Sequence, residues 1–129
     1  MPTSILSSVI ALGLFGLGVV FVFAPEEAGT ALTGRGDPLA FSLLGAALAG
    51  LGATNWMTRR QPLGGIYGRP IVLMNLAHFV IGGLALLRVG LDGEATGWTW
   101  VLCAFYLAGA ALYGVLLFGE PAHLKRAPS

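Results

Sequence analysis

The chain has 129 residues, of which 56% are hydrophobic and only 10% carry a charge, and its mean hydropathy is +0.81. A soluble domain carries about 25% charged residues, so this chain cannot cover a water-facing surface with polar groups, and lipid is its expected solvent. The net charge of +1 argues against a nucleic-acid partner, which requires a dense basic face. The single cysteine, Cys103, excludes an internal disulfide and a cysteine-cluster metal site.

The first apolar run, residues 5–23, carries no charge and ends before Pro25, Glu26 and Glu27. About 20 apolar residues span a hydrocarbon core, and no basic segment precedes the run as it would in a cleaved signal peptide. We therefore predict a membrane-spanning helix. Residues 25–38 are acidic and rich in glycine and are expected to form a loop. Asp37 and Pro38 are suited to be the N-cap and the first residue of the next helix.

Three further runs complete the pattern. They cover residues 39–56, 70–87 and 98–118, and a polar tail follows at 119–129. The second span holds small residues at the spacing that lets helix backbones approach closely in lipid: Gly45, Ala46, Ala49, Gly50 and Gly52. The sequence thus predicts a single all-α domain, an integral membrane four-helix bundle with antiparallel, up-and-down spans.

Basic residues favour one side of this bundle. Alternating spans place Arg59, Arg60, Arg69, Lys125 and Arg126 together with both termini. The opposite side has only Arg35 and Arg88, beside Glu26, Glu27, Asp37, Asp92 and Glu94. Because cytoplasmic loops carry the excess of Lys and Arg, both termini are predicted to be cytoplasmic. Trp56, Tyr67, Trp98 and Trp100 lie at predicted span ends, as interfacial aromatic residues do. The abundance of Ala, Gly and Leu suggests a bacterial cytoplasmic membrane.

Two spans resemble each other. Residues 45–50 read GAALAG and residues 109–114 read GAALYG, 64 positions later. A duplicated helical hairpin would give two such halves related by an axis along the membrane normal. Chance is the alternative, because Gly, Ala and Leu are common in all membrane spans. Both interpretations stay open.

The spans contain no Asp or Glu, which argues against a proton relay or a cation-coupled antiporter. No span carries the paired histidines that would ligate a b-type haem within one chain. The sequence also shows no nucleophile with a neighbouring base, no paired carboxylates and no metal cluster. We expect a protein that is not an enzyme.

Asn55, Asn75 and His78 are the side chains in the spans with strong hydrogen-bonding needs. Asn75 and His78 share a helix face, and Asn55 lies at a similar depth on the preceding span, so the two asparagines are placed to bond to each other. One interpretation is a polar clamp between helices, with a neutral His78 bonded to a backbone carbonyl or a tyrosine. Another is that all three line a cavity for a lipid, a quinone or another small amphiphile. A third is that His78 alone ligates the metal of a tetrapyrrole.

Arg59, Arg60 and Arg69 also have two interpretations. The positive-inside bias alone explains them. Alternatively, they lie at the mouth of the cavity or bind anionic lipid headgroups.

The favoured function is non-enzymatic: an accessory or structural subunit of a larger membrane complex, or a homo-oligomer. Four short spans bury little area among themselves, and their glycine-rich faces offer more close-packing surface than one bundle needs. The alternative is a binder or carrier of an amphiphile at Asn55, Asn75 and His78. Expected partners are membrane lipids and other membrane subunits or a second copy, and no metal or other cofactor is expected.

Overall fold

A computed structural model describes residues 3–61 and 68–119. These residues form five helices and no strand: α1 (Thr3–Phe23), α2 (Pro25–Thr33), α3 (Pro38–Thr58), α4 (Gly68–Leu91) and α5 (Gly97–Phe118). All except α2 are long and apolar enough to cross a membrane. The prediction of an all-helical fold with four hydrophobic spans is therefore confirmed for the described residues. Helices α3 and α4 extend one to four residues beyond their predicted limits at both ends. Helices α1 and α5 start one or two residues earlier than predicted and end where predicted.

Helix α2 corrects the sequence analysis, which expected a loop over residues 25–38. Pro25 is its first residue, where a missing N–H costs nothing, and Glu26 and Glu27 lie in the first turn, where the helix dipole favours negative charge. Gly34 ends the helix with a φ of 71°, and its N–H donates to the Thr30 carbonyl. These local signals mark where this helix of 9 residues starts and stops.

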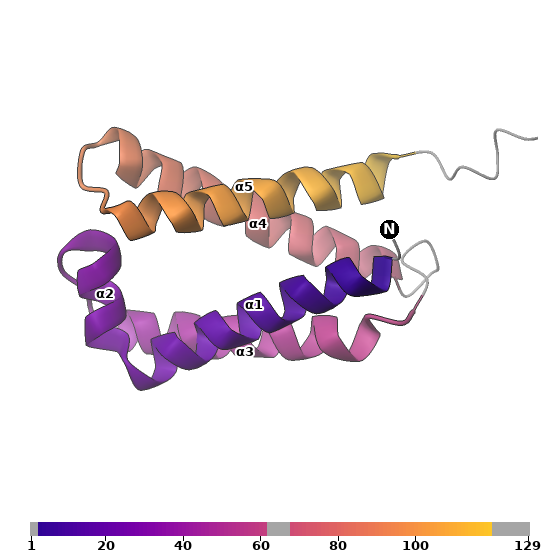
Figure 1. The fold of residues 1–129 in the computed structure, drawn as a ribbon, viewed down its shortest axis with the longest axis horizontal. Helices are drawn as coiled ribbons and strands as arrows, with labels where there is room; N and C mark the ends of the chain where they lie inside the picture. The colour runs from indigo at the N-terminus through magenta and orange to yellow at the C-terminus, as the bar shows by residue number, and fades with distance from the viewer. Residues whose placement is uncertain (1–2, 62–67, 120–129) are drawn as a thin grey trace, which may run out of the picture.

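Capping side chains begin two of the long helices. The Asp37 Oδ1 atom accepts a hydrogen bond from the Leu39 N–H at 2.9 Å, and Pro38 opens α3, so the predicted helix start is confirmed. Thr96 and Thr99 form a reciprocal capping box at the start of α5. Both caps lie at the same end of the molecule as α2 (Figure 1).

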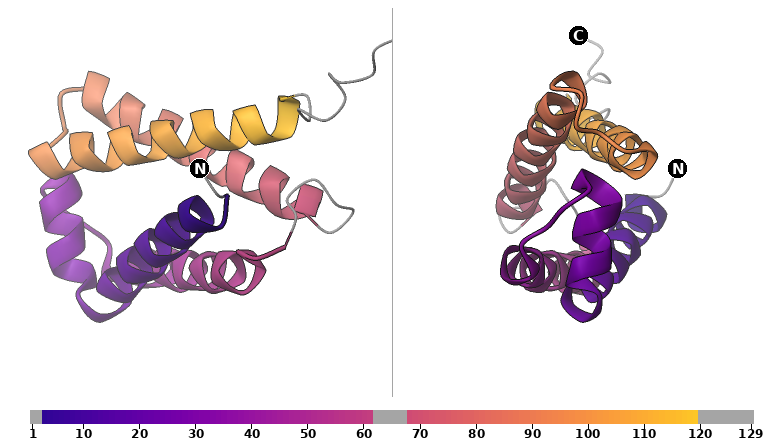
Figure 2. Two further views of the ribbon diagram at one scale, coloured as in Figure 1. Left: turned by 45° about the vertical axis from the view of Figure 1, so that its right-hand side comes forward. Right: turned by 90° about the vertical axis from the view of Figure 1, so that its left-hand side faces the viewer.

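The long helices lie in two pairs, α1 beside α3 and α4 beside α5 (Figures 1 and 2). Helices α1 and α3 touch backbone to backbone. A Cβ atom placed on Gly18 would lie 2.5 Å from the Ala49 nitrogen and 2.6 Å from the Gly45 oxygen. One placed on Gly52 would lie 2.5 Å from the Phe15 nitrogen. The small residues therefore allow the close approach that was expected of the second span.

The second pair packs through aromatic rings instead. Gly82 on α4 lies under the ring of Tyr106, and Gly109 on α5 lies under the ring of Phe79, whose Cδ1 would be 2.7 Å from an added Cβ. Phe79 also stacks on Tyr113, with ring centroids 5.8 Å apart. Each half thus consists of two paired helices, but α1 and α3 meet through their backbones whereas α4 and α5 meet through aromatic side chains. Gly45 and Gly109, which begin the repeated hexapeptides, each face the other helix of their own pair.

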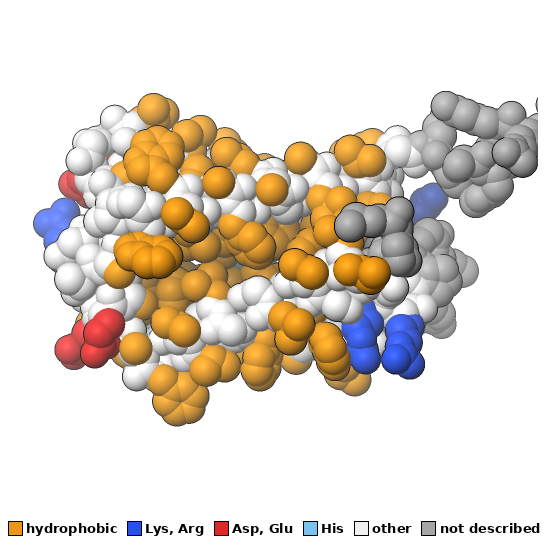
Figure 3. Space-filling model, in the orientation of Figure 1, with side chains coloured by type: hydrophobic (Ala, Val, Ile, Leu, Met, Phe, Trp, Pro, Cys, Tyr) orange, Lys and Arg blue, Asp and Glu red, His pale blue; other side chains and the backbone are white. Residues whose placement is uncertain are grey.

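Charged side chains gather at the two ends of the molecule, and the face between them is largely apolar (Figure 3). Arg59 and Arg60 follow α3 and Arg69 begins α4, at the end where α1 starts and α5 stops (Figure 1). The opposite end holds acidic residues in α2 and in the segments beside the long helices, together with Arg35 and Arg88. These acidic residues are Glu26, Glu27, Asp37, Asp92 and Glu94. The Arg35–Glu94 and Arg88–Asp92 pairs are exposed, each with an N–O distance of 3.7 Å. Tyr67, Lys125, Arg126 and most of the predicted tail lie outside the described residues.

Candidate functional site

The amides of Asn55 and Asn75 form a closed pair between α3 and α4. The Asn55 Nδ2 atom donates to the Asn75 Oδ1 at 2.8 Å, and the Asn75 Nδ2 donates to the Asn55 Oδ1 at 2.9 Å. Each Nδ2 also donates to a carbonyl one turn earlier on its own helix, that of Leu51 or of Ile71. Tyr113 on α5 adds a hydrogen bond to the Asn55 Oδ1 at 3.2 Å. Both side chains are fully buried and use all their donors, so they join the two helix pairs.

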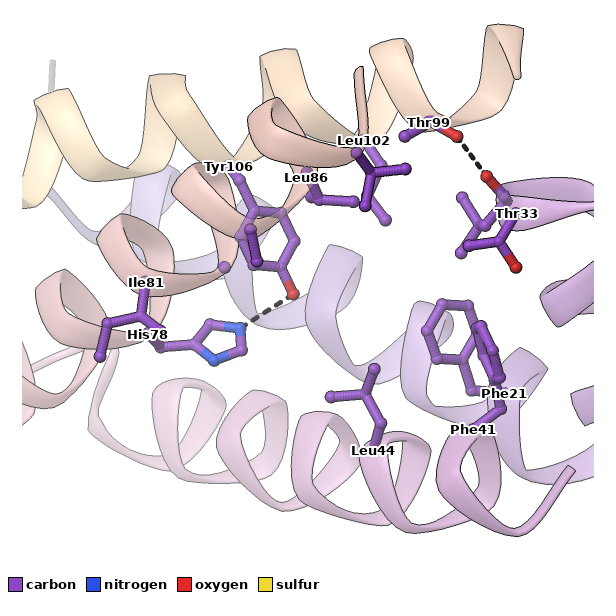
Figure 4. Close-up of a pocket in the computed structure, with 14 residues that line it drawn as sticks. Phe21, Thr33, Phe41, Leu44, His78, Ile81, Leu86, Thr99, Leu102 and Tyr106 are labelled. Carbon is purple, nitrogen blue, oxygen red and sulfur yellow. Dashed lines mark hydrogen bonds between the residues drawn. The ribbon is translucent and has the colours of Figure 1, made fainter. Parts of the chain in front are cut away.

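His78 lies apart from this amide pair. Its Nε2 is 3.0 Å from the hydroxyl oxygen of Tyr106 on α5, and the two ring centroids are 5.2 Å apart (Figure 4). Phe79 packs edge-on against both rings. The sequence analysis had allowed for a tyrosine partner, and this contact supplies one. His78 remains half-buried, because one side of its ring faces a cavity.

This cavity, which we call the histidine cavity, lies between the two helix pairs and has a volume of about 490 Å³. Helices α1, α2 and α3 supply one wall, and α4 and α5 supply the other (Figure 4). The lining is Phe21, Leu32, Thr33, Phe41, Leu44, His78, Ile81, Gly82, Ala85, Leu86, Val89, Thr99, Leu102 and Tyr106. It includes His78 but neither asparagine. The structure therefore separates the three residues that the sequence analysis had grouped around one cavity.

A second cavity of about 600 Å³ lies between α1, α2 and α5. Phe21, Leu32 and Leu102 line both cavities, so these three side chains form a partition between them. The rest of the second lining is Gly13, Leu17, Val20, Ala28, Ala31, Trp98, Val101 and Phe105. The histidine cavity is distinguished from it by the imidazole and hydroxyl groups.

Helix α2 lies across one end of the gap between the helix pairs (Figure 2). It is attached to the start of α5 by two side-chain hydrogen bonds. The Thr96 hydroxyl donates to the Ala31 carbonyl, and the Thr99 hydroxyl donates to the Leu32 carbonyl, the latter drawn in Figure 4. Both acceptors belong to the last turn of α2, where carbonyls lack partners within the helix. The threonines thus hold α2 over the two cavities.

The three arginines are not in the lining of the histidine cavity. The Arg59 guanidinium lies 3.8 Å from the ring centroid of Trp56, a cation–π contact at the end of α3. Arg60 and Arg69 are exposed. Binding of lipid headgroups by these residues stays a prediction.

Four residues of the site were not singled out by the sequence analysis: Tyr106, Tyr113, Thr96 and Thr99. The threonines carry a local signal, since a capping residue before an apolar run marks a helix start. Tyr106 and Tyr113 lie 28 and 58 positions from their partners, and no local pattern indicates such a contact.

The described residues include no group of three His, Cys, Asp or Glu side chains that could hold a metal ion. Since Tyr106 engages the His78 Nε2, a tetrapyrrole metal would have to use Nδ1. Comparison with protein-family models, curated proteins and solved structures gives no match for this chain.

Proposed function

We propose that this chain is a small, non-enzymatic integral protein of a bacterial cytoplasmic membrane that binds an uncharged amphiphile in the histidine cavity. In this proposal the spans are antiparallel and up-and-down, and both termini are cytoplasmic. Arginines at one end and acidic residues at the other support this orientation. Arg60 and Arg69, being exposed at the arginine end, are placed to meet anionic lipid headgroups.

One observation carries the binding function: a histidine–tyrosine pair lines a cavity that is otherwise almost wholly apolar. His78 lies near the centre of α4, a helix of 24 residues, and hence near the middle of a hydrocarbon core about 30 Å thick. Polar side chains at that depth are costly unless they are paired or functional. Ligand cavities typically have volumes of about 300–1,000 Å³ and a few polar groups in an apolar lining, a description that fits this one.

Two substitutions on α4 test the proposal. Ala85 lines the cavity, whereas Ala77 is exposed on the same helix but is not in the lining. We expect Ala85→Trp to fill the cavity and abolish a bound amphiphile, and Ala77→Trp to leave it in place. The measurement is mass spectrometry of organic extracts from protein purified in mild detergent. Equal amphiphile content in both variants, or none in the wild type, would contradict the proposal.

Assembly with other membrane subunits, or with a second copy, is a second candidate function. It is favoured by glycines that the described fold leaves open, since a Cβ placed on Gly16 or Gly50 would meet nothing within 4 Å. Open small residues let another helix approach closely. Crosslinking in membranes and native mass spectrometry test this function, and a chain that is monomeric by both measurements would exclude it.

A further inference from the structure

We infer that the histidine cavity takes the uncharged ring of a quinone-type molecule, held through a carbonyl or hydroxyl oxygen. The inference rests on the proposed function and adds the chemical class of the ligand. Three features carry it: the depth of the cavity and its lack of charged side chains, a His78 nitrogen to which no described residue bonds, and the aromatic walls.

The cavity excludes a charged headgroup. Its lining contains no Lys, Arg, Asp or Glu, so an ionic group would have no counter-charge there. At the centre of a spanning helix, desolvation of such a group would cost several kcal/mol. A polar group that enters must therefore be neutral. The hydroxyls of Thr33 and Thr99, which also line the cavity, already donate to the Gly29 and Leu32 carbonyls, so the ligand is expected to bond at His78 or Tyr106.

The His78–Tyr106 pair matches both a carbonyl and a hydroxyl. Tyr106 engages Nε2, and among the described residues nothing bonds to Nδ1. A neutral imidazole has one donor and one acceptor nitrogen. When the Tyr106 hydroxyl donates to Nε2, Nδ1 carries the proton and donates to a carbonyl. When Nε2 donates to Tyr106, Nδ1 accepts from a ligand hydroxyl. Oxidised and reduced forms of one ring therefore both find a partner.

The walls favour a flat ligand. Phe21 and Phe41 meet edge to face at 5.3 Å between centroids, and with Tyr106 they place aromatic rings on the walls of the cavity (Figure 4). Leu44 on α3 and Ile81 on α4 are 43% and 68% exposed, so the cavity opens sideways between these helices. A hydrocarbon tail on the ring would leave through this opening and remain among the acyl chains.

Binding to the full chain in nanodiscs of dioleoylphosphatidylcholine tests the inference. The probes are radiolabelled decylubiquinone, its quinol, decylbenzene and dodecanoate, each counted against empty nanodiscs. We expect the quinone and the quinol to bind within about 3-fold of each other, because one nitrogen serves both. Decylbenzene should bind about 10-fold more weakly, because it loses one hydrogen bond. Dodecanoate should not bind above the level of empty nanodiscs.

Variants separate the oxygen contact from general effects. His78→Leu should weaken quinone and quinol about 10-fold and leave decylbenzene unchanged, and Tyr106→Phe, which keeps the ring, should weaken them about 3-fold. Met74→Leu, at an exposed position of α4 outside the lining, should change nothing.

Decylbenzene that binds as tightly as the quinone, or His78→Leu that behaves like Met74→Leu, would overturn the inference. The proposed function would survive that result if Ala85→Trp still removed the probes. If no probe bound above empty nanodiscs and no amphiphile copurified, the proposed function would fail as well.

Discussion

At the scale of single residues, the asparagine pair and the histidine–tyrosine pair do different things. The amides of Asn55 and Asn75 bond to each other, to backbone carbonyls and to Tyr113, and they do not reach the cavity. His78 lines the cavity, its Nε2 contacts Tyr106, and no other described residue bonds to its Nδ1. In our proposal the first pair contributes to stability and the second to recognition of the ligand.

Substitution of the amides tests this division. Asn75→Leu leaves the Asn55 amide buried with one partner fewer, and we expect a loss of about 0.6–2 kcal/mol in the free energy of unfolding. The Asn55→Leu/Asn75→Leu double variant should lose less than the sum of the single variants. Unfolding in mixed micelles with increasing SDS measures these values. Strictly additive losses, or loss of a copurifying amphiphile in Asn75→Leu, would contradict the division.

At the scale of helices, glycine position decides which substitutions are tolerated. A Cβ on Gly18 would press on the backbone of α3 at 2.5–2.9 Å, and a helix backbone cannot yield as a side chain can. We expect Gly18→Ala to destabilise the protein by about 1–3 kcal/mol. Gly50→Ala, which meets nothing within 4 Å, should stabilise it by up to about 1 kcal/mol. Thermal unfolding in detergent compares the two variants. Similar midpoints would show that α1 and α3 are not in close backbone contact at Gly18.

The attachment of α2 gives a second prediction for a helix. Thr99→Val removes the hydroxyl that donates to the Leu32 carbonyl but keeps the shape of the side chain. We expect faster hydrogen exchange in the last turn of α2 and unchanged exchange in α3, because the loss frees only that turn. Mass spectrometry of exchanged peptides reads both segments. If α2 exchanged as slowly as in the wild type, the threonines would not be what holds it.

The sequence allowed the long helices to be predicted but not α2. Runs of about 20 apolar residues identify spans whatever surrounds them, and Asp37 with Pro38 marked one helix start correctly. The segment PEEAGTALT is short and polar, and its composition resembles that of a loop. It does carry helix signals: Pro25 and the two glutamates favour a helix start, and Gly34 favours a helix end. These signals indicate a helix only when they are considered together.

At the scale of the whole molecule, the separation of charge predicts how the chain sits in a membrane. Gln61 lies at the arginine end and Glu94 at the acidic end, and both are exposed. In a Cys103→Ser background, we expect Glu94→Cys to react with an impermeant maleimide in intact cells. Gln61→Cys should react only after lysis. The reverse pattern of labelling would show the opposite orientation.

What the sequence could not supply is how the two helix pairs meet. Asn55 on α3 and Tyr113 on α5 come from different pairs and lie 58 positions apart in the chain, and the gap that becomes the histidine cavity depends on where the pairs diverge. Periodicity and composition describe one helix at a time. Asn55, Asn75 and His78 were recognised as functional candidates, but their tyrosine partners and the separation of His78 from the asparagines required the fold.

The backbone seam between α1 and α3 has a consequence for biosynthesis. Every contact that closes it comes from residues before 59, so this half does not need α4 or α5 to close the seam. We expect the nascent chain to release this half into the lipid as one finished unit. Asn55 has no Asn75 partner until α4 is inserted, so we expect formation of the amide pair to join the two halves of the folded protein.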